Sequence, residues 1–595
     1  MKPMKIVLPI VIAALASVTA YAPINDFYRL IAFNIGVYYI AATGFNILVG
    51  QTGQKSLGHA GLFGVGAYTV ALLTVNYQVG PWLALLCAAG MSAIFGVVIA
   101  IPALKVKGPS LAMVTIAFGL LIEKIVSEWT DVFMGQAGFS GITSLGFNGV
   151  ALDSRQWVVA VALLALVLHA LTSSLLSGRF GRGFAAVRTS EIAAESVGVS
   201  VYRFKILAFA ISATTCGIAG ALVAEQNQYI NSDFVNFNLS VFFLVVVLFG
   251  GKSPAGSFLG AVVLTLVDAF LARWPEIQHF AYGAILLFAL YVMPDGLSGL
   301  LTRVGRVSKP REVAAISNGE TRLPGRMTTA TGKTTTAAAT SGRPLLEVRS
   351  LSKAYGGVIP TNDVSFSIDP GTIVSLIGPN GAGKTTTLNL LSGLVIPDSG
   401  SITFKGKSIV GLSPNQIAAC GIGRTFQNLK LFQGLTVLEN VMVGCYRRQT
   451  SGFVSNLLGL PGKRKEEDRV RAEAFEILRF LELDRYAHDQ AEGLPYGLQR
   501  RLEIARALAT GPDLLLLDEP AAGLNPHETD QLTGLISRLK TQGLTILLIE
   551  HHMDLVMAIS DHIVVLDYGV KIASGLPSHI QQNASVIEAY LGAAA

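Results

Sequence analysis

The feature that most constrains this chain is a glycine-rich loop, GPNGAGKT, at residues 378–385. It fits the pattern G-x-x-x-x-G-K-[ST], in which small residues expose backbone N–H groups to phosphate oxygens. In this pattern Lys384 supplies a positive charge and Thr385 supplies a hydroxyl for Mg²⁺. The aliphatic run 373–377 before the loop predicts a buried strand, and the run from Thr386 onward has helical spacing. The loop therefore predicts phosphate binding on an α/β fold.

A second segment, TGKTTT around Gly332, resembles the latter half of the same loop. Met327 stands where the first glycine belongs, and no strand-like run precedes it. We therefore predict that this second segment does not bind phosphate.

The chain as a whole is too apolar for an ordinary soluble enzyme. Hydrophobic residues make up 51% and charged residues 14% of its 595 residues, and the mean hydropathy is +0.52. The net charge of +6 does not indicate nucleic-acid binding, because the basic residues are scattered among loops and are not interleaved with aromatic residues. Much of the sequence must face lipid, and the basic residues fit a cytoplasmic membrane surface.

Apolar stretches recur through the first 300 residues, each near the ~20 residues that a helix needs to cross hydrocarbon. They predict about ten membrane-spanning helices, of which the third and eighth are the weakest. Threading an even number of spans from an inside N-terminus places most basic loops in the cytoplasm, where Lys and Arg collect. The predicted spans are 6–22, 29–49, 57–77, 81–101, 109–127, 157–177, 204–225, 236–251, 255–272 and 279–301.

Residues 1–22 have two interpretations. Two lysines precede an apolar core, and Ala20-Tyr21-Ala22 resembles a signal-peptide cleavage site, but we favour a retained first helix. The segment 306–344 is rich in Thr, Ala, Gly and Ser and has no periodicity, which predicts a flexible linker. The predicted organisation is a polytopic all-α membrane domain at 1–305, this linker, and an α/β phosphate-binding domain at 345–595.

From Leu345 onward the sequence resembles the nucleotide-binding domain of ABC transporters, with the motifs in family order. The Walker B motif is the aliphatic run 514–517 followed by Asp518 and Glu519. In such a site the first carboxylate holds Mg²⁺, usually through water, and the second orients or deprotonates the water that attacks the γ-phosphate. The resemblance thus implies ATP and Mg²⁺ as cofactors.

Three further residues take their roles from this resemblance. Tyr355 in KAYGG would stack on adenine, Gln427 in TFQN would be the Q-loop glutamine near Mg²⁺ and the membrane interface, and His551 in IEHHM would contact the γ-phosphate. The predicted catalytic residues are Glu519, His551 and Gln427. The predicted nucleotide and Mg²⁺ contacts are Tyr355, Gly378, Pro379, Asn380, Gly381, Ala382, Gly383, Lys384, Thr385, Thr386, Gly497, Gln499 and Asp518, with Thr385, Gln427 and Asp518 at the metal.

The ABC signature, ordinarily LSGGQ, aligns with LPYGLQRR at 494–501. It opens a helix whose N-terminus faces the γ-phosphate of the partner subunit. Pro495 replaces the usual serine, so recognition would rest on the N–H of Gly497 and the helix dipole. Proline is tolerated near a helix start, and we expect ATPase activity to survive. In this family one ATP lies between the Walker A loop and the signature of opposite subunits, so a second ATP domain is required.

The D-loop position carries Asn525 where many relatives have Asp. The replacement of Asp by Asn puts in doubt whether the two nucleotide sites would communicate as they do in those relatives.

The membrane part also resembles a known family. The segment 46–61 and the loop 181–200 look like the permeases of branched-chain amino acid importers, and LPYGLQRRLEIARAL and DEPAAGLNP are typical of the ATPases of that family. The resemblance implies that Glu191 to Gly198 forms a short cytoplasmic coupling helix that docks near a Q-loop. The alternative interpretation of this segment is a solvated amphipathic loop helix.

Ionisable residues within the predicted spans are candidates for function by default. Glu123 and Lys124 lie near the end of a span, where pairing or snorkelling costs little. We assign a substrate role to none of the five candidates, which are His59, Glu123, Lys124, His169 and Asp268.

The resemblance implies a multi-pass subunit of the bacterial inner membrane that imports branched-chain or hydrophobic amino acids, with its ATP domain in the cytoplasm. Its expected partners are a second permease and a second ATP-binding subunit, an extracytoplasmic solute-binding protein and membrane lipid, and nucleic acid is not expected. Whether two identical chains pair stays open. The alternatives are an importer of urea or short amides and a regulatory membrane ATPase that transports nothing.

Overall fold

The computed structural model describes residues 4–104, 106, 108–147, 150–293, 296–299 and 343–591. All but the last two residues of the predicted linker 306–344, and the segment around Gly332, lie outside the described residues.

The chain forms two compact units, which we call the helical unit and the sheet unit. Each unit includes a short segment that chain order would place in the other one. The helical unit comprises Met1–Phe184, Tyr202–Arg311 and Phe453–Gly459, and the sheet unit comprises Ala185–Val201, Glu312–Gly452 and Leu460–Ala595.

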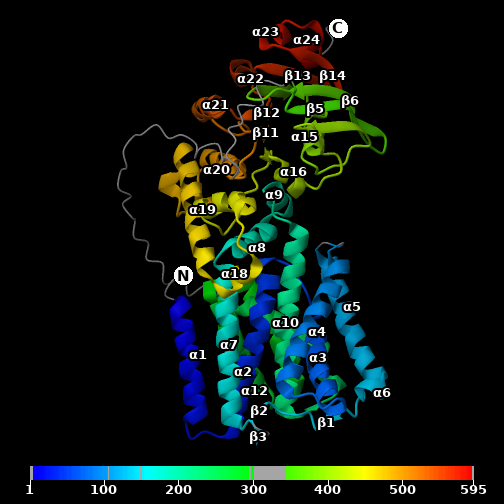
Figure 1. Cartoon of the computed structure of the whole chain (residues 1–595), viewed down its shortest axis with the longest axis vertical. Helices are drawn as coiled ribbons and strands as arrows, with labels where there is room; N and C mark the ends of the chain where they lie inside the picture. The colour runs from blue at the N-terminus through cyan, green and yellow to red at the C-terminus, as the bar shows by residue number, and fades with distance from the viewer. Residues whose placement is uncertain are drawn as a thin grey trace. The chain divides into compact units, whose positions relative to one another are not determined.

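The helical unit is built from long apolar helices (Figure 1). Among the described residues eight helical segments have the length and hydropathy of membrane spans, including the two predicted as weakest. A shorter apolar helix overlaps the first predicted span, and the 18-residue helix Pro275–Val292 overlaps the first part of the tenth. The ten are α1 (Met4–Tyr21), α2 (Asp26–Asn46), α3 (His59–Ala71), α4 (Pro81–Ala103), α5 (Pro109–Glu128), α7 (Ser154–Leu176), α10 (Val201–Asn227), α11 (Phe237–Gly250), α12 (Pro254–Leu271) and α13 (Pro275–Val292).

Two π-helical turns, η1 (Ile47–Gln51) and η2 (Leu72–Asn76), extend α2 and α3. The connections between spans carry the helix α6, the 3-10 turn η3 and two pairs of two-residue strands. Their bounds are α6 (Thr130–Phe133), η3 (Ser232–Phe234), β1 (Phe139–Ser140) with β4 (Tyr229–Ile230), and β2 (Gly146–Phe147) with β3 (Val150–Ala151).

Buried polar side chains hold these helices to one another. The amide of Asn46 donates to Ser257 Oγ at 2.9 Å and so ties α2 to α12. His59 Nε2 shares a 2.6 Å hydrogen bond with Ser212 Oγ on α10. His169 Nδ1 on α7 shares one of 2.6 Å with the hydroxyl of Tyr39 on α2. Both histidines therefore satisfy buried partners within the helix bundle, as buried polar groups usually do.

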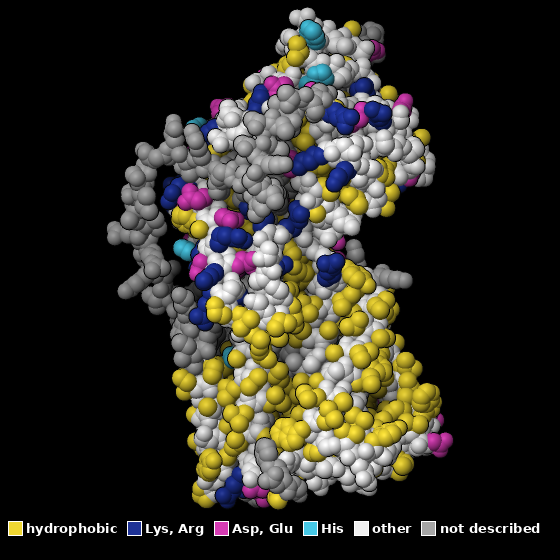
Figure 2. Space-filling view, viewed as in Figure 1, with side chains coloured by type: hydrophobic (Ala, Val, Ile, Leu, Met, Phe, Trp, Pro, Cys, Tyr) yellow, Lys and Arg dark blue, Asp and Glu magenta, His cyan; other side chains and the backbone are white. Residues whose placement is uncertain are grey.

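The two units differ in the side chains that they expose. Hydrophobic side chains gather over the helical unit, whereas Lys, Arg, Asp and Glu gather over the sheet unit (Figure 2). Exposed apolar residues on α4, for example Leu83, Leu86 and Ile94, are 57%, 70% and 58% exposed. A surface of this kind fits contact with lipid.

The sheet unit contains a six-stranded sheet whose first five strands are parallel. All five residues of β7, β11 and β12 are buried, as expected for parallel strands covered on both faces. Along β11, Leu515 and Leu517 face one core while Leu514 and Leu516 face the other. In spatial order the strands are β10 (Ile422–Arg424), β11 (Leu514–Asp518), β12 (Thr545–Ile549), β7 (Ile373–Ile377), β13 (His562–Asp567) and antiparallel β14 (Val570–Gly575).

A four-stranded antiparallel sheet packs against one of these cores. Its strands, in spatial order, are β6 (Val358–Ile368), β5 (Leu346–Tyr355), β8 (Ser399–Phe404) and β9 (Lys407–Ser408). The main helices that accompany the two sheets are α15 (Lys384–Leu391), α16 (Pro414–Cys420), α17 (Val437–Gly444), α19 (Pro461–Phe480), α20 (Tyr496–Leu508), α21 (Pro526–Thr541), α22 (Met553–Ile559), α23 (Pro577–Gln581) and α24 (Ala584–Leu591).

Each exchanged segment carries a short helix. Helix α9 (Glu191–Ser196), from between α8 (Arg179–Thr189) and α10, belongs to the sheet unit. Helix α18 (Phe453–Leu458), from between α17 and α19, belongs to the helical unit.

A buried ionic cluster fixes α20 against the loop that follows β10. Glu503 is 1% exposed and lies 3.4 Å from both Arg500 and Arg506. Arg500 also donates to the carbonyl oxygens of Phe426 at 2.8 Å and Gln427 at 2.5 Å. The carboxylate thus neutralises two buried guanidinium groups that hold the backbone of this loop in place.

Removal of Glu503 should loosen this region. Replacement by Ala leaves two buried cations without their acid, a change that costs about 3–5 kcal/mol when one partner of a buried pair is lost. In hydrogen–deuterium exchange of the full chain in detergent, amides of 422–431 and α20 should exchange faster. The control is Glu476→Ala, which removes an exposed pair with Arg479 worth only about 0.5 kcal/mol. Equal exchange in both variants would contradict a structural role of the cluster.

Candidate functional site

The candidate site lies where four neighbouring parallel strands end. The glycine-rich loop follows β7, Gln427 follows β10, Asp518 and Glu519 end and follow β11, and His551 follows β12. Because parallel strands share one carboxyl edge, residues far apart in the sequence meet there. The spatial order β10-β11-β12-β7 places these four segments side by side.

The glycine-rich loop requires glycine at two of its positions. Gly378 and Gly383 have φ of +150° and +92°, and a Cβ would lie 2.0 Å from Leu566 O and 1.8 Å from Pro360 O, respectively. Lys384 Nζ lies across the loop and donates to the carbonyl oxygens of Gly378 at 2.7 Å and Pro379 at 2.8 Å. Burial lowers the pKa of this lysine, while Glu519 and Asp518 oppose that effect.

The rest of the loop leaves an accessible face for phosphate. Asn380 and Gly381 are exposed, Ala382 is buried, and Thr385 is exposed in the first turn of α15. Thr386 follows in the same turn and is half-buried. Backbone N–H groups at this helix start have no partner within the helix, so they suit an anion.

Glu519 is the point at which the three predicted catalytic residues meet. The amide of Gln427 donates to one carboxylate oxygen of Glu519 at 2.9 Å, and Nε2 of His551 shares a 2.9 Å hydrogen bond with the other. The backbone φ of Glu519 is +46°, a left-handed conformation that is strained for a residue with a side chain. Side-chain contacts from two neighbouring loops therefore fix a carboxylate on a strained turn.

Asp518 has one engaged and one unengaged carboxylate oxygen. Arg424 donates to its Oδ2 at 3.2 Å, and both residues are buried. Its Oδ1 is buried and has no hydrogen-bond partner among the described residues. Burial raises the pKa of Asp518 and the Arg424 guanidinium opposes this shift. An oxygen that lacks a partner fits a hard cation such as Mg²⁺ or its bound water.

Sequence reasoning missed Arg424. The sequence feature that could have revealed it is an arginine at the end of the short buried segment that forms β10, because a buried charge requires a partner.

The helix of the predicted signature begins directly after Pro495, a position at which proline is compatible with a helix start. Helix α20 begins at Tyr496, so Pro495 occupies the N-cap and its carbonyl accepts the first helical hydrogen bond, from Gln499 N at 3.0 Å. The side chain of Gln499 donates to Leu494 O at 2.8 Å, so this amide organises its own loop. Gly497 is packed closely, since a Cβ there would lie 2.6 Å from Glu528 Oε1.

Asn525 caps the helix that follows the D-loop. Its side-chain oxygen accepts from Glu528 N at 2.9 Å, and the Glu528 carboxylate accepts from Asn525 N at 3.0 Å. Asn caps helices as well as Asp does, so the departure from the common residue preserves this local structure. Tyr355, at the end of β5, is 50% exposed, and Lys353 Nζ lies 5.5 Å from the centroid of its ring.

The segment predicted as a coupling helix is ordered within the sheet unit. Ser190 caps α9 by accepting from Ala193 N at 3.3 Å, and α9 packs against α16. Ser196 lines the same small pocket as Phe426, which directly precedes Gln427. A Cβ on Gly198 would lie 2.4 Å from the side chain of Arg447.

Arg447 also donates to Ala418 O on α16 at 2.9 Å. This guanidinium thus connects α16 to the turn that follows α9. The described contacts fit a docked helix and do not fit a solvated one.

Two further features escaped sequence reasoning. Helix α18 lies on α7, where Ser174 Oγ donates to Asn456 O at 2.8 Å and the Phe453 ring meets Phe180 edge-on at 5.7 Å. Glu225 on α10 is fully buried, and among the described residues neither of its carboxylate oxygens has a partner. The acid was visible near the end of a predicted span, but nothing in its spacing indicated which way it would point.

Three family models match this chain. The model described as branched-chain amino acid transport system / permease component matches residues 28–290, the ABC transporter model matches 361–522, and the branched-chain amino acid ATP-binding cassette transporter model matches 570–595. The first two matches cover most of the residues in the two predicted domains.

Individual relatives match the C-terminal part. The high-affinity branched-chain amino acid transport ATP-binding protein BraF of Pseudomonas aeruginosa is 47% identical over 253 residues, which is 42% of this chain and 99% of the relative. LivG of Escherichia coli, which bears the same description, is also 47% identical over the same shares. A probable LivG of Archaeoglobus fulgidus is 38% identical over 42% of this chain and 96% of the relative. The chain therefore belongs to the branched-chain amino acid ABC transporter family and joins a multi-pass permease to an ATP-binding, ATP-hydrolysing cassette in one polypeptide.

Proposed function

We propose that this protein uses ATP to import branched-chain amino acids across the bacterial inner membrane. The observation that carries the proposal is the position of helix α9, which lies within the permease part of the sequence but packs into the cassette. Ser196 of α9 lines a pocket with Phe426, the residue before Gln427. The side chain of Gln427 in turn donates a hydrogen bond to the proposed catalytic carboxylate of Glu519. The family membership of both parts supports the cargo. The three relatives named above are described as branched-chain amino acid transport proteins, and none of these descriptions mentions urea or short amides.

Each residue of the site has a defined task in this proposal. The backbone N–H groups of the glycine-rich loop and Lys384 bind the phosphates, and Tyr355 stacks on the adenine. Glu519 accepts a proton from, or orients, the attacking water, and Gln427 and His551 hold its two oxygens in place. Gly497 and the start of α20 contact the γ-phosphate in a second cassette, and Gln499 shapes that loop.

Mg²⁺ fits the oxygens that the site presents. Asp518 Oδ1 and the hydroxyl of Thr385 would hold the ion or its water, with Gln427 nearby. When bound, the ion neutralises charge that develops on the β- and γ-phosphates. Arg424 keeps the second oxygen of Asp518 engaged and so orients the first.

The assembly requires further subunits. We propose a second permease and a second cassette, since one signature and one glycine-rich loop of a single chain belong to two different ATP sites. An extracytoplasmic solute-binding protein would deliver the amino acid, and the sheet unit would lie in the cytoplasm. In this arrangement residues 306–344 link a membrane domain at 1–305 to a cassette at 345–595.

The cargo can be tested in membrane vesicles that contain the complete complex and its binding protein. ATP-dependent uptake of labelled leucine, isoleucine and valine is expected, because the family membership of both parts points to these substrates. Uptake of labelled urea without leucine would contradict the proposed cargo.

Glu519→Gln should bind ATP but hydrolyse it at least about 100-fold more slowly, because a neutral amide cannot accept the proton of the attacking water. Phosphate release and equilibrium binding of labelled ATP measure the two properties separately. The matched control is Glu492→Gln, an exposed acid whose side chain makes no described hydrogen bond. Undiminished phosphate release from the Glu519 variant would refute its role.

Gly198→Ala should weaken the docking of the α9 segment. Gly198 has φ +85° and its new Cβ would meet Arg447, so strain of about 1–2 kcal/mol is expected, equivalent to about 5–30-fold in the docked population. Leucine uptake per ATP hydrolysed should fall while ATP affinity stays near normal. Gly462→Ala, where a Cβ meets nothing within 4 Å, is the control. An unchanged ratio of uptake to hydrolysis would mean that this segment does not couple the two.

A further inference from the structure

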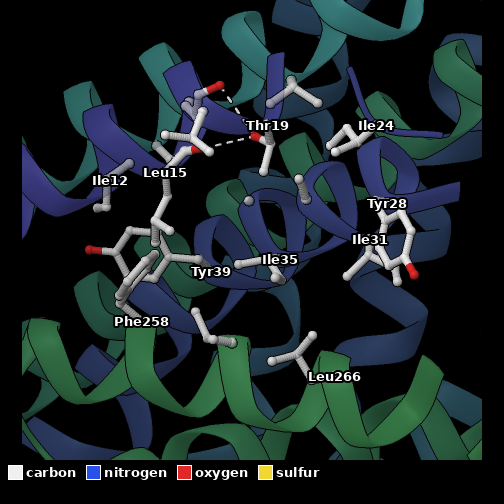
Figure 3. A pocket seen from close by; sticks show the side chains of 18 of the residues that line it. Ile12, Leu15, Thr19, Ile24, Tyr28, Ile31, Ile35, Tyr39, Phe258 and Leu266 are labelled. Carbon is white, nitrogen blue, oxygen red and sulfur yellow. Dashed lines mark hydrogen bonds between the residues drawn. The ribbon is translucent and has the colours of Figure 1, made fainter. Parts of the chain in front are cut away.

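The helical unit contains two large cavities with opposite chemistry. One, of about 460 Å³, lies among α1, α2, α7 and α12 and is lined mainly by aliphatic side chains (Figure 3). Two of its polar side chains have partners: Thr19 donates to Leu15 O at 2.8 Å, and the hydroxyl of Tyr39 is bonded to His169. No charged residue of the described part of the chain lines this cavity.

The second cavity, of about 540 Å³, is lined by residues of α2, α3, α10, α11, α12 and α13 and of the connection between α10 and α11, which includes η3. Its size lies within the roughly 300–1,000 Å³ that small-molecule sites occupy. Five asparagines, two aspartates and two tyrosines line it together with apolar side chains. We call it the asparagine cavity. The asparagines are Asn34, Asn227, Asn231, Asn236 and Asn238.

Part of this polar lining is engaged in shaping the cavity. Asn236 caps α11 by accepting from Leu239 N at 3.0 Å, and Asn231 donates to Asp233 at 3.2 Å. In contrast, the side-chain amides of Asn34, Asn227 and Asn238 make no hydrogen bond to another described residue. An amide offers both a donor and an acceptor, so these three can serve either end of a zwitterion.

A carboxylate lies in the aromatic part of the same lining. Asp268 on α12 accepts a hydrogen bond from the hydroxyl of Tyr282 on α13. The ring of Phe242 packs edge-on against Tyr38 at 4.8 Å and against Tyr282 at 5.7 Å. An ionisable residue among membrane spans is costly and marks a functional path more often than a structural one.

We propose that the asparagine cavity is the permease's binding site for an amino acid zwitterion with an aliphatic side chain. The Asp268 carboxylate accepts from the α-ammonium group, and the amides of Asn34 and Asn227 donate to the α-carboxylate. The aliphatic side chain packs against Phe63, Val223 and Leu239. This assignment rests on the proposed import of branched-chain amino acids and locates where the permease holds its cargo.

The two cavities supply a matched pair of substitutions on one helix. Asp268 lines the asparagine cavity, whereas Leu266, two residues earlier on α12, lines the aliphatic one. Asp268→Asn keeps the size of the side chain and removes its charge. Asp268→Glu keeps the charge, and Leu266→Ala tests a general disturbance of α12.

The test measures leucine uptake and ATP hydrolysis by the complete complex with its binding protein in proteoliposomes. Asp268→Asn and Asn34→Leu should each raise the KM for uptake by about tenfold or more, as expected for the loss of a charged hydrogen bond. Asp268→Glu should restore part of the affinity and Leu266→Ala should leave it unchanged. Basal ATP hydrolysis should be unaffected in Leu266→Ala, because Leu266 lines neither the nucleotide site nor the asparagine cavity.

A second readout identifies the ammonium contact. In the wild type, 4-methylpentanoate, which has the leucine skeleton without the ammonium group, should compete poorly, and Asp268→Asn should reduce the preference for leucine over it. Wild-type KM and preference in both Asp268→Asn and Asn34→Leu would overturn the cavity assignment and leave the import function standing. ATP hydrolysis without leucine uptake by the wild type would overturn both.

Discussion

The burial of a parallel sheet on both faces is the constraint on which the cassette depends. Strands β7, β11 and β12 expose nothing along their length, so only their ends can carry polar chemistry. Since the strands run parallel, all of those ends lie on one edge, and the order β10-β11-β12-β7 brings four functional loops together. A register shift of one residue in β11 would move each of its side chains to the other face of the sheet. Asp518 and Glu519 would then no longer point to their partners in the site. The two leucine-rich cores on either side of β11 therefore fix the catalytic geometry as firmly as the polar contacts do.

Polar groups within the cassette are held by buried charges. Glu503 neutralises Arg500 and Arg506, and Arg500 in turn holds the backbone of Phe426 and Gln427. Gln427 then binds Glu519, so a chain of contacts runs from α20 to the carboxylate of Glu519. The same loop adjoins the pocket that Ser196 of α9 lines. A displacement of α9 thus has a short physical route to Glu519, the proposed catalytic residue.

Much of this arrangement was predictable from local sequence. The loop at 378–385, the carboxylates after an aliphatic strand and the apolar spans follow from sequence patterns. The structure has the loop between a strand and a helix and the carboxylates at the end of β11, and eight of the ten predicted spans have the length and hydropathy of membrane helices among the described residues. The partners of buried charges were not predictable, because Arg424 and Asp518 are 94 positions apart and pair only through the fold. The contact between α18 and α7 was not predictable either, because its residues are also distant in the sequence. The same holds for the cavity that Asn34, Asn227 and Asp268 line from three helices.

The exchange of α9 and α18 between the two units has a consequence for assembly. The relatives BraF and LivG are described as ATP-binding proteins, and each match covers 99% of the relative but 42% of this chain. Here the segment that packs into the cassette belongs to the same polypeptide as the cassette, and joining two partners in one chain sets a local concentration of about a millimolar. The packing of α9 into the cassette of its own chain then does not depend on the amount of a separate permease subunit. Because the permease and the cassette are parts of one polypeptide, every chain that is synthesised contains one copy of each.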